Sequence, residues 1–272
     1  MEHLQIISEP FRDLGRALCI VTGASKGFGR TLSLQLSLLM KPGSVLILVA
    51  RSIDPLESLK VEIEAVTGTW RKLEVRCVQA DLQETEGVER SVQEVKEAMS
   101  GDIEHLLLIN NAGSLGDISR SALSFSDPDE VNRYLALNVS SALSLTAGVF
   151  SVDRRRLSLR RTVVNISSLC ARRPFKSWTL YCAGKAARDM MFSVLAQEEP
   201  EMRVLNYAPG PLDTDMQLQA RSLSADLNLR RSFSSMFSSG KLLTCQESGA
   251  KLMKLLLEDQ FNSGAHLDYY DL

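Results

Sequence analysis

The sequence predicts one doubly wound α/β domain, with a seven-stranded, mainly parallel sheet and helices on both faces of it. Two observations lead to this fold class. Seven short β-rich runs alternate along the 272 residues with segments long enough for a helix. The first six runs mostly lack the apolar–polar alternation of a half-exposed strand, which is typical of strands covered on both faces. Parallel neighbours also need long, right-handed crossovers, and the intervening segments can supply them as helices.

The predicted elements follow one another in strict alternation. The strands are expected at Ala17–Thr22, Ser44–Ala50, Leu73–Gln79, His105–Asn110, Thr162–Ile166, Met202–Tyr207 and Ala265–Tyr269. The helices are expected at Arg30–Met40, Pro55–Thr67, Thr85–Met99, Glu130–Val149, Tyr181–Gln197 and Gln246–Glu258. No internal repeat or linker divides residues 1–272, so we expect a single domain with an N-terminal extension over residues 1–13.

Two segments break this alternation. Ser151–Arg161 carries five arginines in eleven residues. Either a partner-binding patch or a solvated loop before a buried strand would explain it, and we favour the loop. Residues 217–241 are polar and serine-rich, and we expect them to form a flexible lid over a site at the carboxyl ends of the strands.

The composition excludes several classes of protein. Hydrophobic residues make up 44% of the chain and charged residues 24%, which excludes a disordered or collagen-like chain. The net charge of −2 gives no long-range field for nucleic acid or anionic lipid, and the apolar runs are too short to span a membrane, so we expect neither partner. Five widely spaced cysteines without a CxxC pair predict no zinc site and no disulfide framework. With no secretory pattern at the N-terminus, a cytoplasmic location is expected.

A glycine-rich turn follows the first predicted strand and precedes a helix. Such a turn lets the backbone approach a pyrophosphate, which then lies on the helix N-terminus, as in Rossmann-type dinucleotide sites. The spacing is GxxxGxG rather than GxGxxG, and glycines can also end a strand for steric reasons alone. In this strand–turn–helix context we expect a cofactor site. Its candidate residues are Gly23, Ala24, Ser25, Lys26, Gly27, Phe28 and Gly29.

The end of the second strand predicts which dinucleotide is used. An acid at this place would hold a ribose hydroxyl, whereas Arg51 suits the 2′-phosphate of NADPH, with Ser52 beside it and Lys26 nearby. The alternative is that Arg51 is an ordinary surface residue. The ends of the third and fourth strands extend the predicted cofactor site. They contribute Asp81 and Leu82, and then Asn110, Ala112 and Gly113.

A candidate catalytic set lies at the same edge of the sheet. Tyr181 and Lys185 are four residues apart on a predicted helix and therefore share a face. A nearby ammonium group is expected to lower the pKa of the phenol towards the working pH. Ser168 follows the fifth strand and could donate to a carbonyl oxygen, and Asn138, a polar break in an apolar helix, could hold a water or steady Lys185. Taken alone, a Tyr and a Lys at this spacing are usually a surface pair.

Six motifs occur together over nearly the whole chain. They are TGASKGFG at Thr22–Gly29, NNAG at Asn110–Gly113, Asn138, NISS at Asn165–Ser168, YCAGK at Tyr181–Lys185 and PGPLDTDM at Pro209–Met216. This set resembles the short-chain dehydrogenase/reductase family. The resemblance implies that Asn138, Ser168, Tyr181 and Lys185 form a catalytic tetrad, that hydride passes from the nicotinamide to a carbonyl carbon, and that Lys185 also holds the nicotinamide ribose. It also implies a homodimer.

Longer matches resemble the pterin-reducing members of that family. They include LLLINNAGSLGD at Leu106–Asp117, RTVVNISSLCA at Arg161–Ala171, LYCAGKAARDM at Leu180–Met190, VLNYAPGPLDTDM at Val204–Met216 and SGAHLDYYD at Ser263–Asp271. The resemblance implies NADPH-dependent reduction of pterin side-chain ketones, namely of 6-pyruvoyl-tetrahydropterin to tetrahydrobiopterin and of sepiapterin to dihydrobiopterin. The residues implied on the substrate side are Ser168, Leu169, Tyr181, Gly210 and Asp268. Those implied to close over the cofactor are Leu212, Asp213, Thr214, Asp215, Met216 and Gln217.

In this interpretation Asp268 anchors the pterin, because a carboxylate can accept from the planar donor pair formed by the 2-amino group and the adjacent ring N–H. Without the resemblance, Asp268 would be taken for a solvated acid near a chain end. Two other functions stay open. One is a general carbonyl or dicarbonyl reductase, and the other is a non-catalytic binding protein that senses NADPH. The retained Ser168, Tyr181 and Lys185 argue against the second.

Overall fold

The computed structural model describes residues 13–68 and 72–272, so the extension predicted for residues 1–13 lies almost wholly outside the described part. Seven parallel strands form one sheet in the order β3-β2-β1-β4-β5-β6-β7. They are β1 (Ala17–Thr22), β2 (Val45–Ala50), β3 (Glu74–Gln79), β4 (His105–Asn110), β5 (Arg160–Ile166), β6 (Met202–Ala208) and β7 (Ala265–Asp268). The predicted fold class is confirmed, and every predicted strand is present with its ends shifted by no more than a few residues.

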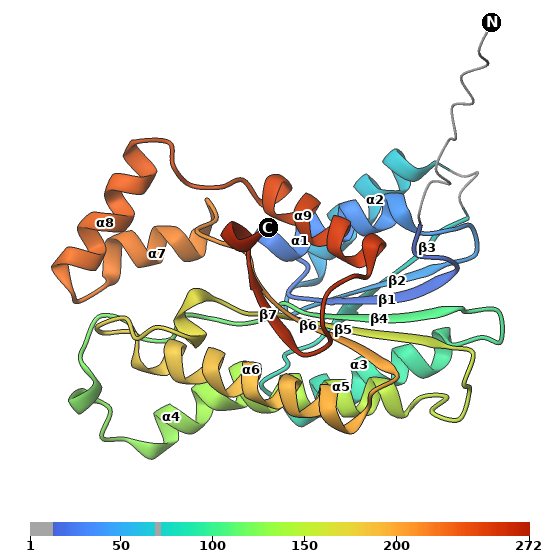
Figure 1. Ribbon diagram of the computed structural model, residues 1–272, viewed down its shortest axis with the longest axis horizontal. Helices are drawn as coiled ribbons and strands as arrows, with labels where there is room; N and C mark the ends of the chain where they lie inside the picture. The colour runs from blue at the N-terminus through green and yellow to red at the C-terminus, as the bar shows by residue number, and fades with distance from the viewer. Residues whose placement is uncertain (1–12, 69–71) are drawn as a thin grey trace, which may run out of the picture.

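Helices cover both faces of this sheet (Figure 1). The α-helices are α1 (Gly27–Leu39), α2 (Ile53–Thr67), α3 (Thr85–Ala98), α4 (Pro128–Leu135), α5 (Ser141–Ser151), α6 (Thr179–Glu198), α7 (Asp215–Leu223), α8 (Leu227–Ser238) and α9 (Cys245–Glu258). Figure 1 shows α1, α2 and α9 on one face and α3, α5 and α6 on the other. The helix predicted over Glu130–Val149 is continuous but contains a π-helical turn, η3 (Ala136–Ser140), between α4 and α5.

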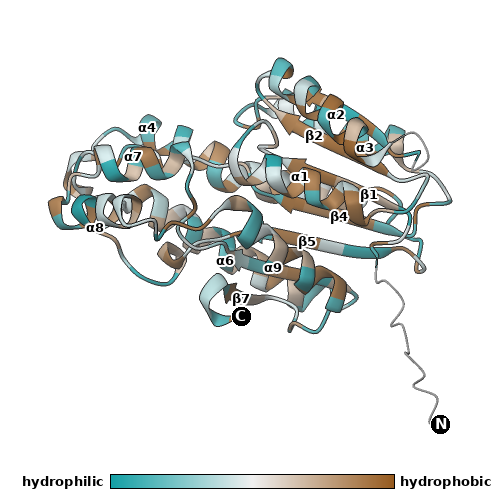
Figure 2. Cartoon of the chain, turned by 90° about the horizontal axis from the view of Figure 1, so that it is seen from above, coloured by the Kyte–Doolittle hydropathy of each residue, from teal (hydrophilic) through white to brown (hydrophobic). Residues whose placement is uncertain are grey.

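The core consists of two apolar layers, one on each face of the sheet. Every residue of β1, β2 and β4 is buried, as expected for central parallel strands, and the strands are brown in Figure 2. Leu32 and Leu36 of α1 lie in one layer, and Leu145 and Val149 of α5 lie in the other. Each of these side chains is fully buried, which stabilises the fold by roughly 1.5–3 kcal/mol apiece.

The segment Pro128–Ser151 is long and apolar enough to cross a membrane, judged by length and composition only. In the structure this segment packs against α3 and α6, and 44% of its most apolar window is buried inside the domain. Its hydrophobic residues, such as Leu145, belong to the core. The segment therefore has the environment of a core helix.

The serine-rich segment 217–241, which we predicted to be a flexible lid, is mostly helical. It forms most of α7 and the whole of α8, whose first turns are capped by Thr214 and Asp226. Phe233 of α8 also stacks on Trp178, with ring centroids 5.4 Å apart. These caps and this stacking supply the order that the polar composition does not indicate. In Figure 1 the two helices extend beyond the body of the sheet.

The arginine-rich segment forms a loop between α5 and β5, as predicted, although Ser151 ends the helix and Arg160 and Arg161 begin the strand. Two of its five arginines, Arg156 and Arg161, are only partly exposed. Arg161 donates to the backbone oxygens of Asp153, Arg154 and Arg156. Arg156 in turn donates to carbonyl oxygens in the turn that precedes β4. These two guanidinium groups satisfy backbone acceptors of the loop and of its neighbour, so they hold the loop in place.

Candidate active site

A cavity of about 1290 Å³ lies at the carboxyl ends of the strands. The strand order reverses between β1 and β4, and ligands of open α/β sheets bind at such a switch point. The cavity is lined by the glycine-rich turn, by the ends of β2 to β5, by the start of α6, and by the segments that follow β6 and β7. Residues far apart in the sequence therefore meet in one cleft, as the positions of the motifs predicted.

The glycine-rich turn has the geometry of a dinucleotide cradle. Gly23 and Gly27 have φ angles of +65° and +55°, which residues with a Cβ adopt at a cost. A Cβ on Gly29 would come within 2.3 Å of the Gly23 carbonyl oxygen, so the start of α1 approaches β1 more closely than any other residue permits. The Asn111 side chain donates to the carbonyl oxygens of Thr22 and Gly23 and fixes the turn from the β4 side. The described residues thus fit a pyrophosphate group.

Two cations lie near this turn. Arg51 lines the cavity at the end of β2 and is exposed, as a partner for a ribose phosphate must be. The ammonium group of Lys26 lies 2.7 Å from a carboxylate oxygen of Asp215 at the start of α7. Contact with this ammonium group lowers the pKa of Asp215. Both cations line the cavity beside the glycine-rich turn, and Lys26 also joins that turn to α7; their contact with a cofactor stays a prediction.

Some predicted cofactor residues lie behind the cavity wall rather than on it. Ala24 is fully buried, Gly29 packs on Gly23, and the Asn110 amide donates to Thr146 of α5. Ser52 precedes α2 on the exposed side. The other predicted cofactor residues line the cavity. They are Gly23, Ser25, Lys26, Gly27, Phe28, Arg51, Asp81, Leu82, Ala112, Gly113, Lys185, Leu212, Asp213, Thr214, Asp215, Met216 and Gln217.

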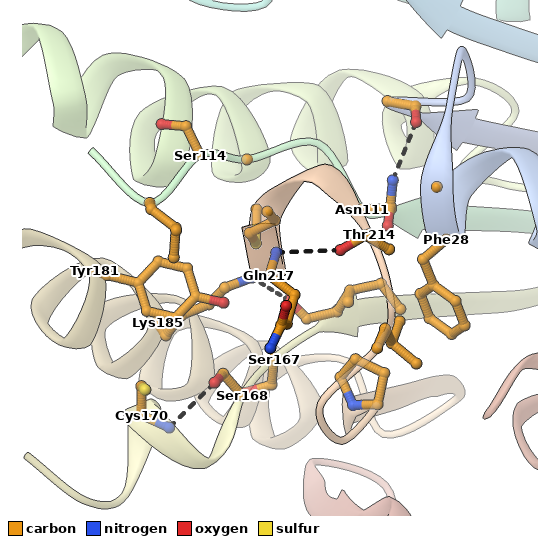
Figure 3. Close-up of a pocket in the computed structure, with 18 of the residues that line it drawn as sticks. Phe28, Asn111, Ser114, Ser167, Ser168, Cys170, Tyr181, Lys185, Thr214 and Gln217 are labelled. Carbon is orange, nitrogen blue, oxygen red and sulfur yellow. Dashed lines mark hydrogen bonds between the residues drawn. The ribbon is translucent and has the colours of Figure 1, made fainter. Parts of the chain in front are cut away.

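Three of the four catalytic candidates, Ser168, Tyr181 and Lys185, lie together on the opposite wall from Phe28 and Thr214 (Figure 3). Tyr181 and Lys185 both project from α6, with the Lys185 nitrogen 5.6 Å from the centre of the Tyr181 ring. Lys185 Nζ donates to the Ile166 carbonyl oxygen at 2.6 Å. Ser168 begins a 3₁₀ turn, η4 (Leu169–Ala171), and its hydroxyl accepts from the Cys170 N–H at 3.1 Å. The three side chains therefore face one volume.

The pKa values correct one expectation. Burial raises the pKa of Tyr181, although the contact with Ser168 lowers it, so Lys185 does not bring the phenol towards neutrality as we had expected. The pKa of Lys185 is itself lowered to about 7, mainly by burial and further by the positive charge of Arg188. Both residues are only 8% exposed, and the Trp178 ring packs against that of Tyr181, so burial disfavours the charged form of each group. The phenol is therefore protonated at neutral pH.

Asn138 lies in the π-helical turn and is buried. Its Oδ1 accepts from the Ser114 N–H at 2.7 Å, and its Nδ2 donates to Ser114 Oγ and to the Tyr134 carbonyl oxygen. Single π turns inside a helix often mark functional positions, because they redirect one residue. Here the redirected amide holds the segment after β4. The structure gives no direct bond from Asn138 to Lys185, so the role expected for it in the tetrad stays a prediction.

Three further candidate substrate residues, Leu169, Gly210 and Asp268, come from the ends of β5, β6 and β7 or from the turns that follow them. Asp268 ends β7, and its Oδ1 accepts from the Tyr270 N–H at 3.0 Å. Gly210 has a φ of +75°, and a Cβ there would come within 2.7 Å of the Leu243 side chain, so the chain turns tightly after β6. Leu169 is exposed on the wall beside Ser168. All three line the cavity, as predicted.

Sequence reasoning missed a buried polar network beneath this site. Arg188 is fully buried and donates to Asn165 Oδ1 at 2.7 Å and to the Ala112 carbonyl oxygen at 3.0 Å. Asp189 accepts from Ser167 Oγ and His266 Nδ1. The only signal in the sequence was the charged pair Arg188–Asp189 inside a helix that also presents an apolar face.

The fold and the site together define an oxidoreductase that works with a nicotinamide dinucleotide, since a glycine-rich turn on the first strand shares its cleft with a Ser, Tyr and Lys set. The chain belongs to the short-chain dehydrogenase family, whose family model, described as "short chain dehydrogenase", matches residues 17–224.

Comparison with individual proteins shows which members of this family the chain is similar to. The chain is 50% identical to a protein of Bos taurus named sepiapterin reductase, over 95% of this chain and 96% of that one. It is 51% identical to the protein of that name from Rattus norvegicus, over 95% and 98%. Benzil reductase ((S)-benzoin forming) of Bacillus subtilis is 32% identical over 76% of this chain and 79% of that one. A solved structure of the KRED1-Pglu enzyme, 26% identical, superposes with a TM-score of 0.77 over 92% of this chain and all of that one.

Proposed function

We propose that this protein uses NADPH to reduce the side-chain ketones of pterins, converting 6-pyruvoyl-tetrahydropterin to tetrahydrobiopterin and sepiapterin to dihydrobiopterin. One observation carries the proposal: a single cavity contains the dinucleotide cradle, the set of Ser168, Tyr181 and Lys185, and the carboxylate of Asp268. The identity of about 50% to proteins named sepiapterin reductase supports it over nearly the whole chain.

The residues have complementary tasks in a carbonyl reduction. A bound reduced nicotinamide supplies the hydride that the carbonyl carbon receives. Tyr181 transfers its phenolic proton to the carbonyl oxygen, and its raised pKa suits this direction because the phenol is protonated beforehand. Ser168 donates a hydrogen bond to the same oxygen. Lys185, with a pKa of about 7, can return a proton to the phenolate at neutral pH.

The choice of NADPH rests on Arg51. Its guanidinium group lies at the end of β2, where the cavity begins, and it can pair with a 2′-phosphate in bidentate fashion. Replacing Arg51 by Ala should therefore weaken the preference for NADPH over NADH, by about tenfold or more. An unchanged preference would show that the 2′-phosphate is bound elsewhere or not at all.

The direct test is the loss of NADPH absorbance after sepiapterin is added to the purified protein. Tyr181→Phe should abolish turnover and leave NADPH binding, measured by fluorescence titration, near that of the wild type. Asp268→Asn should raise the KM for sepiapterin and leave that for a small diketone unchanged, because a diketone has no donor pair for the carboxylate. Turnover by Tyr181→Phe would contradict the catalytic assignment.

A second candidate function is reduction of small dicarbonyl compounds in general. The similarity to benzil reductase favours it, and Ser168, Tyr181 and Lys185 serve either substrate. The two functions differ in the use of Asp268. A kcat/KM for sepiapterin well above that for benzil, lost in Asp268→Asn, would select the pterin.

We also propose a homodimer in the cytoplasm. Leu143 of α5 and Met190 and Val194 of α6 are 51%, 66% and 45% exposed, which is unusual for large apolar side chains on neighbouring helices. The five cysteines are all free thiols, as is usual in a reducing compartment. Light scattering after size exclusion tests the dimer, and fractionation of expressing cells tests the location.

A further inference from the structure

The Asp189 carboxylate and the His266 imidazole form a buried pair beside the cavity that the reaction itself does not use. His266 Nδ1 lies 2.6 Å from Asp189 Oδ2, and the side chains are only 9% and 7% exposed. A carboxylate accepts, so Nδ1 carries the hydrogen that it donates. Asp189 Oδ1 accepts from Ser167 Oγ and from Asn165 Nδ2, and the exposed Arg172 approaches Oδ2 at 3.6 Å. The carboxylate is thus held from several sides.

The pair joins two elements that each contribute functional residues to the cavity. On α6, Tyr181, Lys185 and Asp189 are spaced by four residues and lie along one helix face. On β7, His266 and Asp268 are two residues apart and so project to one side of the strand. The hydrogen bond between Asp189 and His266 therefore connects the helix of the proton donor with the strand of the substrate carboxylate.

Strand β7 needs such a connection more than the central strands do. It has four residues and lies at the edge of the sheet beside β6 (Figure 1). Each of its residues is partly exposed as a whole, even though the His266 side chain is only 9% exposed. Beyond it, Lys251 holds the last turn through the carbonyl oxygens of Tyr269 and Leu272. Those bonds tie the turn to α9, on the other face of the sheet from α6, and they do not fix its distance from Tyr181.

We propose that His266, held by Asp189, is a positioning residue that sets the place of Asp268 relative to Tyr181, and that it thereby determines specificity for substrates bound through Asp268. This inference rests on the proposed pterin reduction. Loss of the His266–Asp189 hydrogen bond should therefore affect pterin substrates more than small diketones. A pterin is fixed at both its ring and its ketone, so a displaced Asp268 weakens its binding, whereas a small diketone meets only Ser168 and Tyr181.

The test compares sepiapterin with 2,3-butanedione in steady-state assays of the full chain with NADPH. His266→Leu should raise the KM for sepiapterin by about tenfold or more, the effect of losing a hydrogen bond to a charged group, and leave kcat and both diketone constants within about twofold. His266→Asn places an amide N–H where Nδ1 was and should restore the KM. His266→Gln places its amide where Nε2 was and should not. Ser193→Ala is the matched control, because it removes a hydroxyl of α6 that donates to the carbonyl oxygens of Asp189 and of Gly264, the residue before β7, and leaves the bond between the Asp189 carboxylate and His266 intact.

The outcomes separate the two proposals. Turnover of sepiapterin by the wild type decides the proposed function, whatever the variants do. Equal losses on both substrates in His266→Leu would assign the pair a merely structural role and overturn the inference. Rescue by His266→Gln but not by His266→Asn would overturn it too, since the imidazole would then act on the substrate directly. Thermal unfolding of each variant identifies any that fails to fold. If His266→Leu does not fold, the KM of His266→Asn for sepiapterin decides the inference: a wild-type value supports it, and a raised value overturns it.

Discussion

Replacing Lys185 by Met should stabilise the protein near neutral pH while it abolishes turnover. The amino group is buried, and burial together with Arg188 lowers its pKa from 10.5 to about 7. Between these pH values the unfolded chain binds a proton that the folded chain does not hold. The free energy of unfolding of the wild type therefore rises with pH over this interval, and the Met variant lacks that contribution.

The size of the effect follows from the same shift. A tenfold change in an equilibrium constant is about 1.4 kcal/mol, so the titration of Lys185 lowers the stability by about 5 kcal/mol below pH 7 and by about 3 kcal/mol at pH 8. The variant also loses the 2.6 Å hydrogen bond from Nζ to the Ile166 carbonyl oxygen, which costs about 1 kcal/mol. We therefore expect Lys185→Met to be about 2 kcal/mol more stable than the wild type at pH 8.

Urea unfolding of the cofactor-free proteins, followed by tryptophan fluorescence at pH 7.5, 8.5 and 9.5, measures this difference. It should shrink by about 1.4 kcal/mol for each pH unit as the pH rises. Lys254→Met is the control, because that side chain is 72% exposed and the same substitution there removes no buried amino group. A Lys185→Met protein that is less stable at pH 8, or a constant difference from the wild type, would refute the burial argument.

Two further predictions concern the turn and the thiols. Gly29→Ala should lower the stability by about 1–3 kcal/mol and weaken NADPH binding, because its Cβ would meet the Gly23 carbonyl oxygen at 2.3 Å. Thermal melting measures the first effect, and titration with NADPH measures the second. Gly101→Ala is the control and should change neither, because nothing lies within 4 Å of a Cβ at that position. A hydrogen bond from the Cys170 thiol lowers the pKa of Cys182 below its usual 9.0. Iodoacetamide should therefore still alkylate Cys182 as the pH falls below that value. The midpoint of the alkylation rate against pH should rise in Cys170→Ala, and an unchanged midpoint would show that Cys170 does not lower the pKa of Cys182.

The sequence predicted the parts of this molecule that depend on local order. Strand β1, the glycine turn and the helix spacing of Tyr181 and Lys185 are each set within a few neighbouring residues, and parallel pairing then brings the strand ends together. The pKa of Tyr181 moved against expectation because burial is set by distant residues: Phe233 stacks on Trp178, whose ring in turn meets the Tyr181 ring edge-on. Local spacing contains no information on that enclosure.

The same limit explains the missed network. Asp189 and His266 are 77 residues apart in the chain, and neither stands in a pattern that indicates a partner. Their pairing depends on the register of β7 beside β6, where His266 lies opposite Asn206. A resemblance can carry over the residues of a motif, such as Asp268, but the support of those residues is decided by the packing of whole elements.

These observations assign a common cause to the chemistry and to the instability of the site. The enclosure that keeps the phenol of Tyr181 protonated also takes the amino group of Lys185 out of water. An exposed lysine would cost nothing in stability but would stay charged at neutral pH, whereas an amino group with a pKa of about 7 can give its proton to the phenolate and exchange it with water at that pH. The destabilising burial of Lys185 and its fitness as a proton donor are therefore one property, and a substitution that relieves the first must remove the second.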